Sequence, residues 1–350
     1  MGAAMRAADL LIVGFEGAEL TVAERKILKR LKPGGVILFQ RNIATDEQLH
    51  ALVADVRALC GDTFLYVDAE GGRVDRLRNL VGPAPAGSAL AVARPVAARQ
   101  AGRWIGLALR HFGFDVDFAP VVDLDRGELD NALDGRYLGA TPRAVATRGR
   151  AFLDGLHSAG VAGCLKHFPG LGAARMDTHR AGAPIALAVE ELALDLAPFR
   201  SLEDRAGMIM ASHASYAAFD AARPATLSPE ISTTLLRRDL GFRGVLVSDD
   251  LEMGALAVWG DLPTRTALAF AAGCDLLPVC RTLEACPAVA AALAVPALRA
   301  RREEAAARLE RFRRHRRAIG RSSDGQRAPS LEAIRRGLFG LRARLSEPST

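Results

Sequence analysis

Residues 160–185 read GVAGCLKHFPGLGAARMDTHRAGAPI, and this stretch decides the fold. It begins with a short apolar run that has the composition of a buried β-strand. At Lys166 and His167 it passes into an irregular segment rich in glycine, proline and polar side chains. A buried strand followed by a polar loop is typical of a parallel α/β sheet, in which such loops carry the functional residues.

Seven further runs of the same kind occur along the chain. They are LLIVGF (10–15), GVILF (35–39), FLYVDAE (64–70), VDFAPVVDL (116–124), GMIMASH (207–213), GVLVSDD (244–250) and CDLLPV (274–279). Most intervening segments have helical composition, and several end in glycine, which suits the position after a helix. Eight buried strands alternating with helices predict a single-domain α/β fold with the sheet closed into a (β/α)8 barrel. An open doubly wound sheet is the alternative, although no GxGxxG follows the first strand.

The charge of the chain is concentrated at one end. The 350 residues carry a net charge of +6, but residues 301–350 hold 14 arginines and 6 acidic residues, a net of +8, which leaves −2 on the remainder. We therefore predict a barrel domain over residues 1–298 and a basic, helical C-terminal extension over residues 299–350. Because no aromatic or RNA-recognition motif accompanies the arginines, we expect a solvated helix and no nucleic-acid site.

The cysteines and the apolar runs indicate the compartment. The five cysteines are an odd number without zinc-type spacing, which favours reduced thiols. We see no secretory signal, and no apolar run reaches the roughly 18 residues of a membrane span. We therefore expect a cytoplasmic protein that does not insert into a membrane.

Polar residues cluster where the predicted strands stop. Because the carboxyl ends of barrel strands meet at one face, these residues predict an active site there, although single polar residues at such positions also cap helices. The clusters are Asp68 with Glu70, Asp123, Lys166 with His167, Ser212 with His213, and Asp249 with Asp250.

Asp249 is the clearest candidate for chemistry. A carboxylate at the end of an apolar strand is costly unless it is paired or used, and it would suit a nucleophile in glycoside chemistry. It would also suit a metal site, but the chain has no HxH or HExxH signature, and Lys166 would place a cation beside the ion. The side chains that could converge on a metal are Asp68, His167, His179, His213 and Asp249.

Two further groups have both a chemical and a plain interpretation. Asp177 and His179 stand two residues apart, and a carboxylate beside an imidazole can support a general acid/base; the alternative is an Asx turn with a surface histidine. Arg73 and Arg76 follow the third predicted strand, where guanidinium groups either bind hydroxyls or a carboxylate or remain solvated.

Taken together, these motifs resemble glycoside hydrolase family 3, in particular its bacterial β-N-acetylglucosaminidases. The resemblance covers about residues 10–285 and includes DAEGGRVDRL, VDFAPVVDLD, GRYLG, LKHFPG, MASHASYAAFD and GFRGVLVSDDLEMGAL. It implies a single barrel and a retaining, two-step hydrolysis of terminal β-linked N-acetylglucosamine, with peptidoglycan fragments in cell-wall recycling as the source. It implies a small carbohydrate partner and no metal or organic cofactor, and we expect a monomer.

The resemblance also implies a role for individual residues. Asp249 matches the nucleophile of the family, His179 its general acid/base and Asp177 the carboxylate that partners the histidine. The residues that match the N-acetylglucosamine subsite are Asp68, Arg76, Arg136, Lys166 and His167.

The chain departs from the family pattern within the 165–185 stretch. Leu171 stands where the family has a second histidine, Ala173 and Ala174 replace an Asp-Thr pair, and Thr178 replaces a serine. Three alternatives remain open: a family 3 β-glucosidase, an N-acetylglucosaminide phosphorylase, and a catalytically impaired sugar-binding relative.

Overall fold

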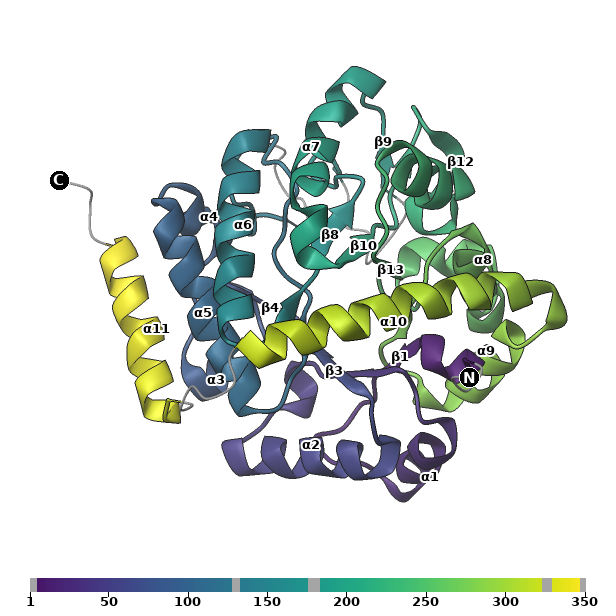
Figure 1. Ribbon diagram of the computed structural model, residues 1–350, viewed down its shortest axis with the longest axis horizontal. Helices are drawn as coiled ribbons and strands as arrows, with labels where there is room; N and C mark the ends of the chain where they lie inside the picture. Colours follow the sequence, from purple (N-terminus) through teal and green to yellow (C-terminus); the bar gives the residue numbers. More distant parts are fainter. Residues whose placement is uncertain (1–4, 128–132, 176–182, 323–328, 347–350) are drawn as a thin grey trace.

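Eight parallel strands form a closed barrel, and helices cover its outside (Figure 1). The computed structural model describes residues 5–127, 133–175, 183–322 and 329–346. Each strand pairs with the next, β14 pairs with β1, and a bridge between Val247 and Leu276 joins the last two, so the ring closes. The predicted (β/α)8 barrel is confirmed. Its strands are β1 (Leu11–Val13), β2 (Gly35–Ile37), β3 (Phe64–Val67), β6 (Val116–Asp117), β7 (Ala162–Gly163) continued by β8 (Leu165–Phe168), β10 (Met208–Ala211), β13 (Val245–Ser248) and β14 (Leu277–Val279).

Helices surround the barrel, and some of them begin at a capping side chain. Thr21 and Thr141, for example, each accept a hydrogen bond from the backbone N–H three residues later. The helices are α1 (Val22–Leu31), α2 (Asp46–Cys60), α3 (Arg78–Val81), α4 (Gly87–Ala91), α5 (Pro95–His111), α6 (Pro142–Ser158), α7 (Val189–Ala206), a π-helix (Glu230–Asp239), α8 (Leu262–Ala272) and α9 (Cys286–Leu293). Short 3-10 turns cover Ala7–Leu10, Gln40–Asn42, Ala225–Leu227, Gly254–Trp259, Leu283–Ala285 and Pro296–Leu298.

Small additions lie on the loops between the strands. A hairpin of β4 (Ala69–Gly71) and β5 (Val74–Asp75) follows β3, and a separate three-stranded sheet joins β9 (Pro184–Ile185), β11 (Ser215–Tyr216) and β12 (Asp220–Pro224). These additions lengthen the loops after the third, fifth and sixth barrel strands, at the end where the candidate site residues lie.

The core is continuous from the barrel interior to the helices. Apart from Phe64 at the start of β3, the barrel strands are buried, as expected for a parallel sheet covered by helices. The α5–α6 contact depends on glycine, since a Cβ at Gly102 would lie 2.1 Å from the carbonyl oxygen of Phe152. The two helices can therefore approach until their backbones touch.

Helix α10 (Arg299–Ser322) crosses the amino-terminal face of the barrel (Figure 1). Arg301 and Arg308 bind the buried Asp275 at 2.6 and 3.0 Å, and Arg316 binds Asp115 at 3.0 Å. Both carboxylates stand at the amino end of a strand. The expectation of a solvated helix is therefore wrong for one side of α10, which also buries Ala305, Leu309, Phe312 and Ile319.

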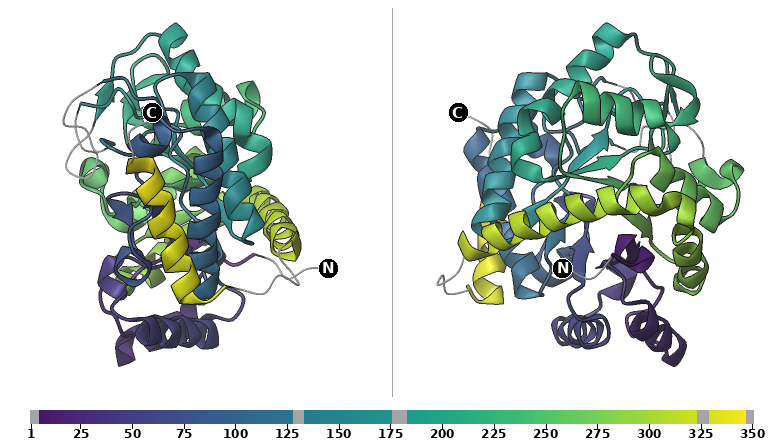
Figure 2. Two further views of the ribbon diagram at one scale, coloured as in Figure 1. Left: turned by 90° about the vertical axis from the view of Figure 1, so that its left-hand side faces the viewer. Right: turned by 45° about the vertical axis from the view of Figure 1, so that its right-hand side comes forward.

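The last helix, α11 (Leu331–Ser346), lies beside α5 (Figure 2). Gly337 stands directly against the Trp104 ring, and Arg335 donates a hydrogen bond to the carbonyl oxygen of Leu80 at 2.8 Å. Both C-terminal helices thus pack into the same core as the barrel. The domain boundary between residues 298 and 299 stays a prediction.

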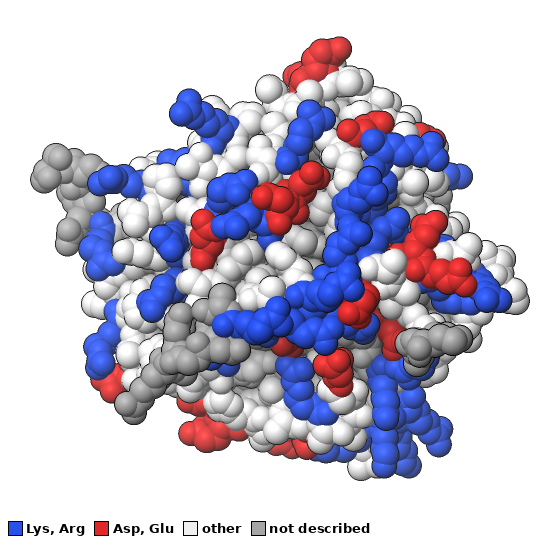
Figure 3. Space-filling view, in the orientation of Figure 1, with Lys and Arg blue, Asp and Glu red and all other residues white. Residues whose placement is uncertain are grey.

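Basic side chains gather along the course of α10 on the face shown in Figure 3. Two of the arginines of this helix nevertheless bind the buried Asp275 and a third binds the partly buried Asp115, so part of the basic character of the segment is used inside the protein. Within the described ranges, no single helix has both the length and the apolar composition to cross a bilayer. Leu283–Leu293 and Pro296–Arg321 pass the same test only as a pair, which bends by 80° at the break.

Candidate active site

A pocket of about 220 Å³ opens at the carboxyl-terminal face of the barrel. Its walls come from residues at or beyond the ends of the strands, as the sequence predicts. Six predicted site residues line it together: Asp68, Arg76, Arg136, Lys166, His167 and Asp249. The other two, Asp177 and His179, lie outside the residues that the structure describes.

A bulge in β8 brings two consecutive residues to the pocket. Between two paired positions, Leu165 with Ile209 and Phe168 with Ala211, β8 advances three residues while β10 advances two. A bulge of this kind changes the direction of the side chains around the extra residue. Lys166 and His167 accordingly both line the pocket, whereas regular alternation would place them on opposite faces of the sheet.

Lys166 stands at the centre of a buried ionic network. Its Nζ lies 2.7 Å from Oδ1 of Asp68 and 2.6 Å from Oε1 of Glu70. Glu70 also accepts two hydrogen bonds from Arg136, from Nε and Nη2, both at 2.8 Å. This bidentate pair and the lysine fix each other, so the cationic groups are held in one arrangement before a ligand arrives.

The network also fixes the protonation states. Burial alone would raise the pKa of Glu70, but the charges of Arg136 and Lys166 outweigh it and hold this pKa far below its usual range. Burial alone would lower the pKa of Lys166, and the carboxylates of Asp68 and Glu70 raise it above the usual value instead. Both groups are therefore charged at neutral pH.

A second carboxylate orients His167. Oδ2 of Asp123 lies 2.8 Å from Nδ1 of the imidazole, and the backbone N–H groups of His167 and Leu171 also donate to Asp123. Because a carboxylate accepts hydrogen bonds, Nδ1 carries the hydrogen, and Nε2 faces Nη2 of Arg136 at 3.5 Å. Asp123 thus sets both the ring orientation and the tautomer.

Asp249 also lines the pocket, from the end of β13. Its backbone N–H donates to the carbonyl oxygen of Ala211 at 3.0 Å, and its Oδ1 accepts a hydrogen bond from the N–H of Asp250 at 2.8 Å. Burial, with smaller effects of the carboxylates of Glu252 and Asp249, raises the pKa of the neighbouring Asp250 to about 6.

His213 does not line the pocket. Its Nδ1 lies 2.8 Å from the hydroxyl of Thr226, and its Nε2 lies 2.9 Å from the carbonyl oxygen of Asp250. The ring joins the loop after β10 to the loop after β13. These two contacts account for both ring nitrogens of His213 in the described structure, and the alternative of a metal site that His213 shares with Asp249 stays a prediction.

Sequence reasoning noticed Glu70 and Asp123 as polar strand ends but assigned neither to the site. It gave no role to Asp117, which is fully buried and accepts a hydrogen bond from the N–H of Ala69 at 2.9 Å. Burial raises the pKa of Asp117 well above its usual range, so it adds no third negative charge beside Asp68 and Glu70. The sequence feature that could have pointed to Asp117 is an acidic residue inside an otherwise apolar run.

Aromatic and cationic groups form the rim of the pocket. The guanidinium of Arg41 stacks over the Phe39 ring at 4.5 Å, and that of Arg76 lies 5.7 Å from the same ring. Arg281 lines the rim from the loop after β14. The rim residues Phe39, Arg41 and Arg281 were not assigned to the site from the sequence. No motif marks them, because a single aromatic residue or arginine in a loop does not by itself indicate a binding site.

The departure from the family pattern has a structural counterpart. Leu171 is buried and lines the pocket, Ala174 is buried, and Ala173 packs against the core. A Cβ at Gly172 would lie 1.9 Å from the carbonyl oxygen of Leu124, so the chain runs close to its neighbour here. The first part of this loop is thus an apolar wall that is packed onto the barrel.

Comparisons with known proteins agree with this architecture. A family model described as glycosyl hydrolase family 3 N terminal domain matches residues 5–312. The chain is 41% identical over 284 residues to the β-hexosaminidase of Methylococcus capsulatus, with 79% of this chain and 84% of that protein covered.

Two solved structures are similar over nearly the whole chain. A glycoside hydrolase family 3 β-N-acetylglucosaminidase from Paenibacillus sp. str. FPU-7 has a TM-score of 0.87 and 32% identity, with 97% of this chain and 68% of that chain covered. NagZ from Neisseria gonorrhoeae, in complex with N-trifluoroacetyl-D-glucosamine, has a TM-score of 0.76 and 31% identity, with 95% and 97% covered. This chain therefore belongs to glycosyl hydrolase family 3, and within that family it is a β-hexosaminidase.

Proposed function

We propose that this chain removes terminal β-linked N-acetylglucosamine by a retaining, two-step hydrolysis. One observation carries the proposal: Asp249 and five side chains suited to binding hydroxyl groups line a single pocket. A carboxylate that faces an array of fixed donors and acceptors across a small cavity is the arrangement required for attack on an anomeric carbon.

The ionic network is suited to hold the non-reducing sugar. Lys166 uses two of its three N–H groups on Asp68 and Glu70, which leaves the third for a sugar hydroxyl. Asp68 retains acceptor capacity, and Arg136 and His167 supply further polar atoms in fixed positions. Because these groups constrain one another, a hydroxyl group meets a preorganised surface, which lowers the entropic cost of binding.

The chemistry assigned to Asp249 and His179 follows the family motif. In the first step His179 protonates the leaving oxygen, while Asp249 attacks C1 and forms a covalent glycosyl-enzyme. In the second step His179 takes a proton from water, which attacks C1 and releases Asp249. Asp177 would orient the imidazole and stabilise its protonated form.

We further propose that the substrate is a peptidoglycan fragment and that the protein acts in the cytoplasm during cell-wall recycling. The similarity to proteins named β-hexosaminidases supports the reaction class. The similarity to NagZ, which binds an N-acetylglucosamine analogue, supports the sugar. The basic rim at Arg41 and Arg281 would suit an acidic aglycone.

The decisive experiment compares aryl β-N-acetylglucosaminide with aryl β-glucoside, each with and without phosphate. We expect preferential cleavage of the N-acetylglucosaminide and free N-acetylglucosamine as product under both conditions. A sugar phosphate as the main product would replace hydrolysis by phosphorolysis. Preference for the glucoside would overturn the substrate assignment, and binding without turnover would overturn the activity.

The acid/base role is tested by the leaving group. His179→Ala should be slow on substrates with poor leaving groups and should recover on activated aryl glycosides, which need little protonation. The measurement is kcat for a series of aryl substrates that differ in the pKa of the released phenol. Equal losses across the series would rule out the acid role.

A further inference from the structure

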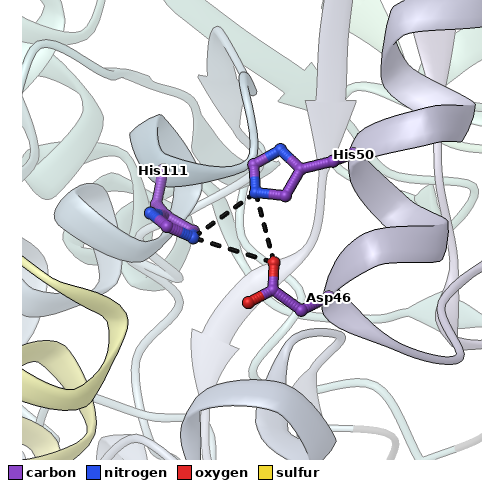
Figure 4. A group of neighbouring side chains, drawn as sticks. All are labelled: Asp46, His50 and His111. Atoms are coloured by element: carbon purple, nitrogen blue, oxygen red, sulfur yellow. Dashed lines mark hydrogen bonds and ion pairs between the residues drawn. The ribbon is translucent and has the colours of Figure 1, made fainter.

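Three potential metal ligands converge on the outside of the barrel, away from the pocket. Asp46 and His50 lie one turn apart on α2, and His111 is the last residue of α5. Figure 4 shows the three side chains pointing toward one another. The Nε2 atoms of the two histidines are 3.4 Å apart, and they lie 3.2 Å (His50) and 3.8 Å (His111) from Oδ1 of Asp46.

Hydrogen bonding alone does not account for this arrangement. A hydrogen bond explains the contact of 3.2 Å, but the contact of 3.8 Å between His111 and Asp46 exceeds hydrogen-bond range. The two Nε2 atoms face each other, and only one of them can donate to the other. A single cation placed between the three atoms would accept a lone pair from each.

The spacing fits a tetrahedral ion. Ligand atoms about 2.0–2.1 Å from Zn²⁺ lie roughly 3.2–3.5 Å from one another in a tetrahedral site. Two of the three observed separations fall at this value, and the third requires a small movement of the partly exposed His111 or Asp46 side chain. Two imidazole nitrogens and one carboxylate oxygen suit zinc or a neighbouring divalent transition metal better than Mg²⁺ or Ca²⁺.

The two rings are also held from behind. The buried Phe112 ring packs against His111 with ring centroids 4.8 Å apart and against His50 with centroids 5.2 Å apart. This contact restricts the rotation of both imidazoles, so little order is lost when a metal binds. The side chains remain partly exposed, with 46% of His50 and 26% of His111 accessible, so an ion can reach the cluster from solvent.

We propose that Asp46, His50 and His111 bind one Zn²⁺ ion per chain and thereby join α2 to α5. The ion would complete its coordination with water, since three protein ligands leave one tetrahedral position open. Helix α2 begins shortly after the pocket rim at Arg41, so the ion would hold the start of this helix against the barrel. Its role would be stabilisation, and hydrolysis would not depend on it.

The test uses the full chain after treatment with a chelator and removal of that chelator. Zn²⁺ titrated into this protein should bind at one ion per chain and raise Tm, because a ligand that binds only the folded state stabilises it. His50→Gln and His111→Gln should each weaken binding by at least about tenfold and reduce the rise in Tm at a given Zn²⁺ concentration accordingly. Co²⁺ should give the visible absorption of a tetrahedral site in the wild type only.

Two controls separate this site from other zinc binding. Glu47→Gln removes an exposed acidic group from the same helical turn, and it should bind Zn²⁺ like the wild type. A titration with saturating N-acetylglucosamine should also be unchanged, because the sugar occupies the pocket. Binding that disappears with the sugar but persists in His50→Gln and His111→Gln would overturn the proposal, as would a Tm that zinc does not change.

Discussion

The two ends of the barrel each hold a buried carboxylate among cations, and of these two clusters the one at the carboxyl end lines the candidate pocket. At the amino end, Asp275 accepts from Arg237 at 2.8 Å, from Arg301 at 2.6 Å and from Arg308 at 3.0 Å. Its remaining capacity is used by the backbone N–H of Leu246 at 3.0 Å. Every oxygen of this carboxylate is thus satisfied, and α10 covers the cluster.

At the carboxyl end the corresponding carboxylate is Glu70. It binds Arg136 and Lys166, but these cations and Asp68 also line an open pocket. The same ion-pair chemistry therefore has two consequences. A cluster that a helix covers joins the strands to that helix, whereas a cluster that lines an open pocket presents fixed hydrogen-bond donors and acceptors to a ligand. The difference lies in what covers the cluster.

The strongest test of the difference between the two ends is to change one carboxylate at the carboxyl end of the barrel. Asp249→Asn should lower kcat/KM on aryl β-N-acetylglucosaminide by at least ~10³-fold, because an amide can neither attack C1 nor carry the charge. Tm should change little, since Asn retains the oxygen that accepts from the N–H of Asp250. The exposed Asp239→Asn is the matched control, and high activity in Asp249→Asn would contradict the assigned nucleophile.

The same change at the closed end should affect stability alone. Asp275→Asn leaves three arginines around a neutral group, and loss of one member of a buried ion pair costs about 3–5 kcal/mol of unfolding free energy. Denaturant midpoints measure this loss, and kcat per folded molecule should stay at the wild-type value. A normal midpoint with reduced kcat would show that the amino end contributes to catalysis.

Glu70→Gln tests whether the open cluster positions its cations. The amide cannot hold both Arg136 and Lys166 as an anion does, and charged hydrogen bonds of this kind contribute about 1.5–3 kcal/mol. We expect kcat/KM to fall by roughly 10–100-fold, mainly through KM. A role confined to folding would instead lower the fraction of active protein and leave KM unchanged.

The smallest expected effect concerns Asp250 and depends on pH. Its pKa is about 6 in the folded chain against an ordinary value of 3.8, so folding favours the protonated acid. This contribution is complete below about pH 4 and is lost as the pH rises through 6. Asp250→Asn mimics the neutral acid and should be more stable than the wild type at pH 8 by about 1–2 kcal/mol, a value reduced for partial exposure.

Unfolding free energies at pH 8 and pH 4 provide the measurement for Asp250→Asn. The advantage of the variant should fade at pH 4, where the wild-type carboxyl is already protonated. An advantage of equal size at both pH values would mean that packing, not ionisation, is responsible.

The barrel could be predicted because each strand is an apolar run and five of the eight runs stop at polar residues, as at Asp249. The position of both Lys166 and His167 in the pocket could not be predicted. Regular alternation along a strand places consecutive side chains on opposite faces, and no sequence feature indicates the bulge in β8. The pairing of Glu70 with Arg136 spans 66 residues and begins in the short strand β4. Contacts of that kind depend on the completed fold.

The prediction that the C-terminal helix is solvated failed for a different reason. Its many arginines suggested solvent, but Leu309 and Phe312 follow helical spacing and face the core. Composition describes the whole helix, whereas burial concerns one side of it. The buried partner of its arginines, Asp275, lies in an apolar strand context, and the two segments come together only when the barrel closes.

The position of α10 has a consequence for how the molecule is made. During synthesis the strands emerge first, and Asp275 and Asp115 stay without these arginines until α10 has left the ribosome. Until then, Phe312 is absent from the amino end and the strands there are exposed. Nascent chains halted between β14 and α10 should therefore be more prone to proteolysis and aggregation than chains halted after it.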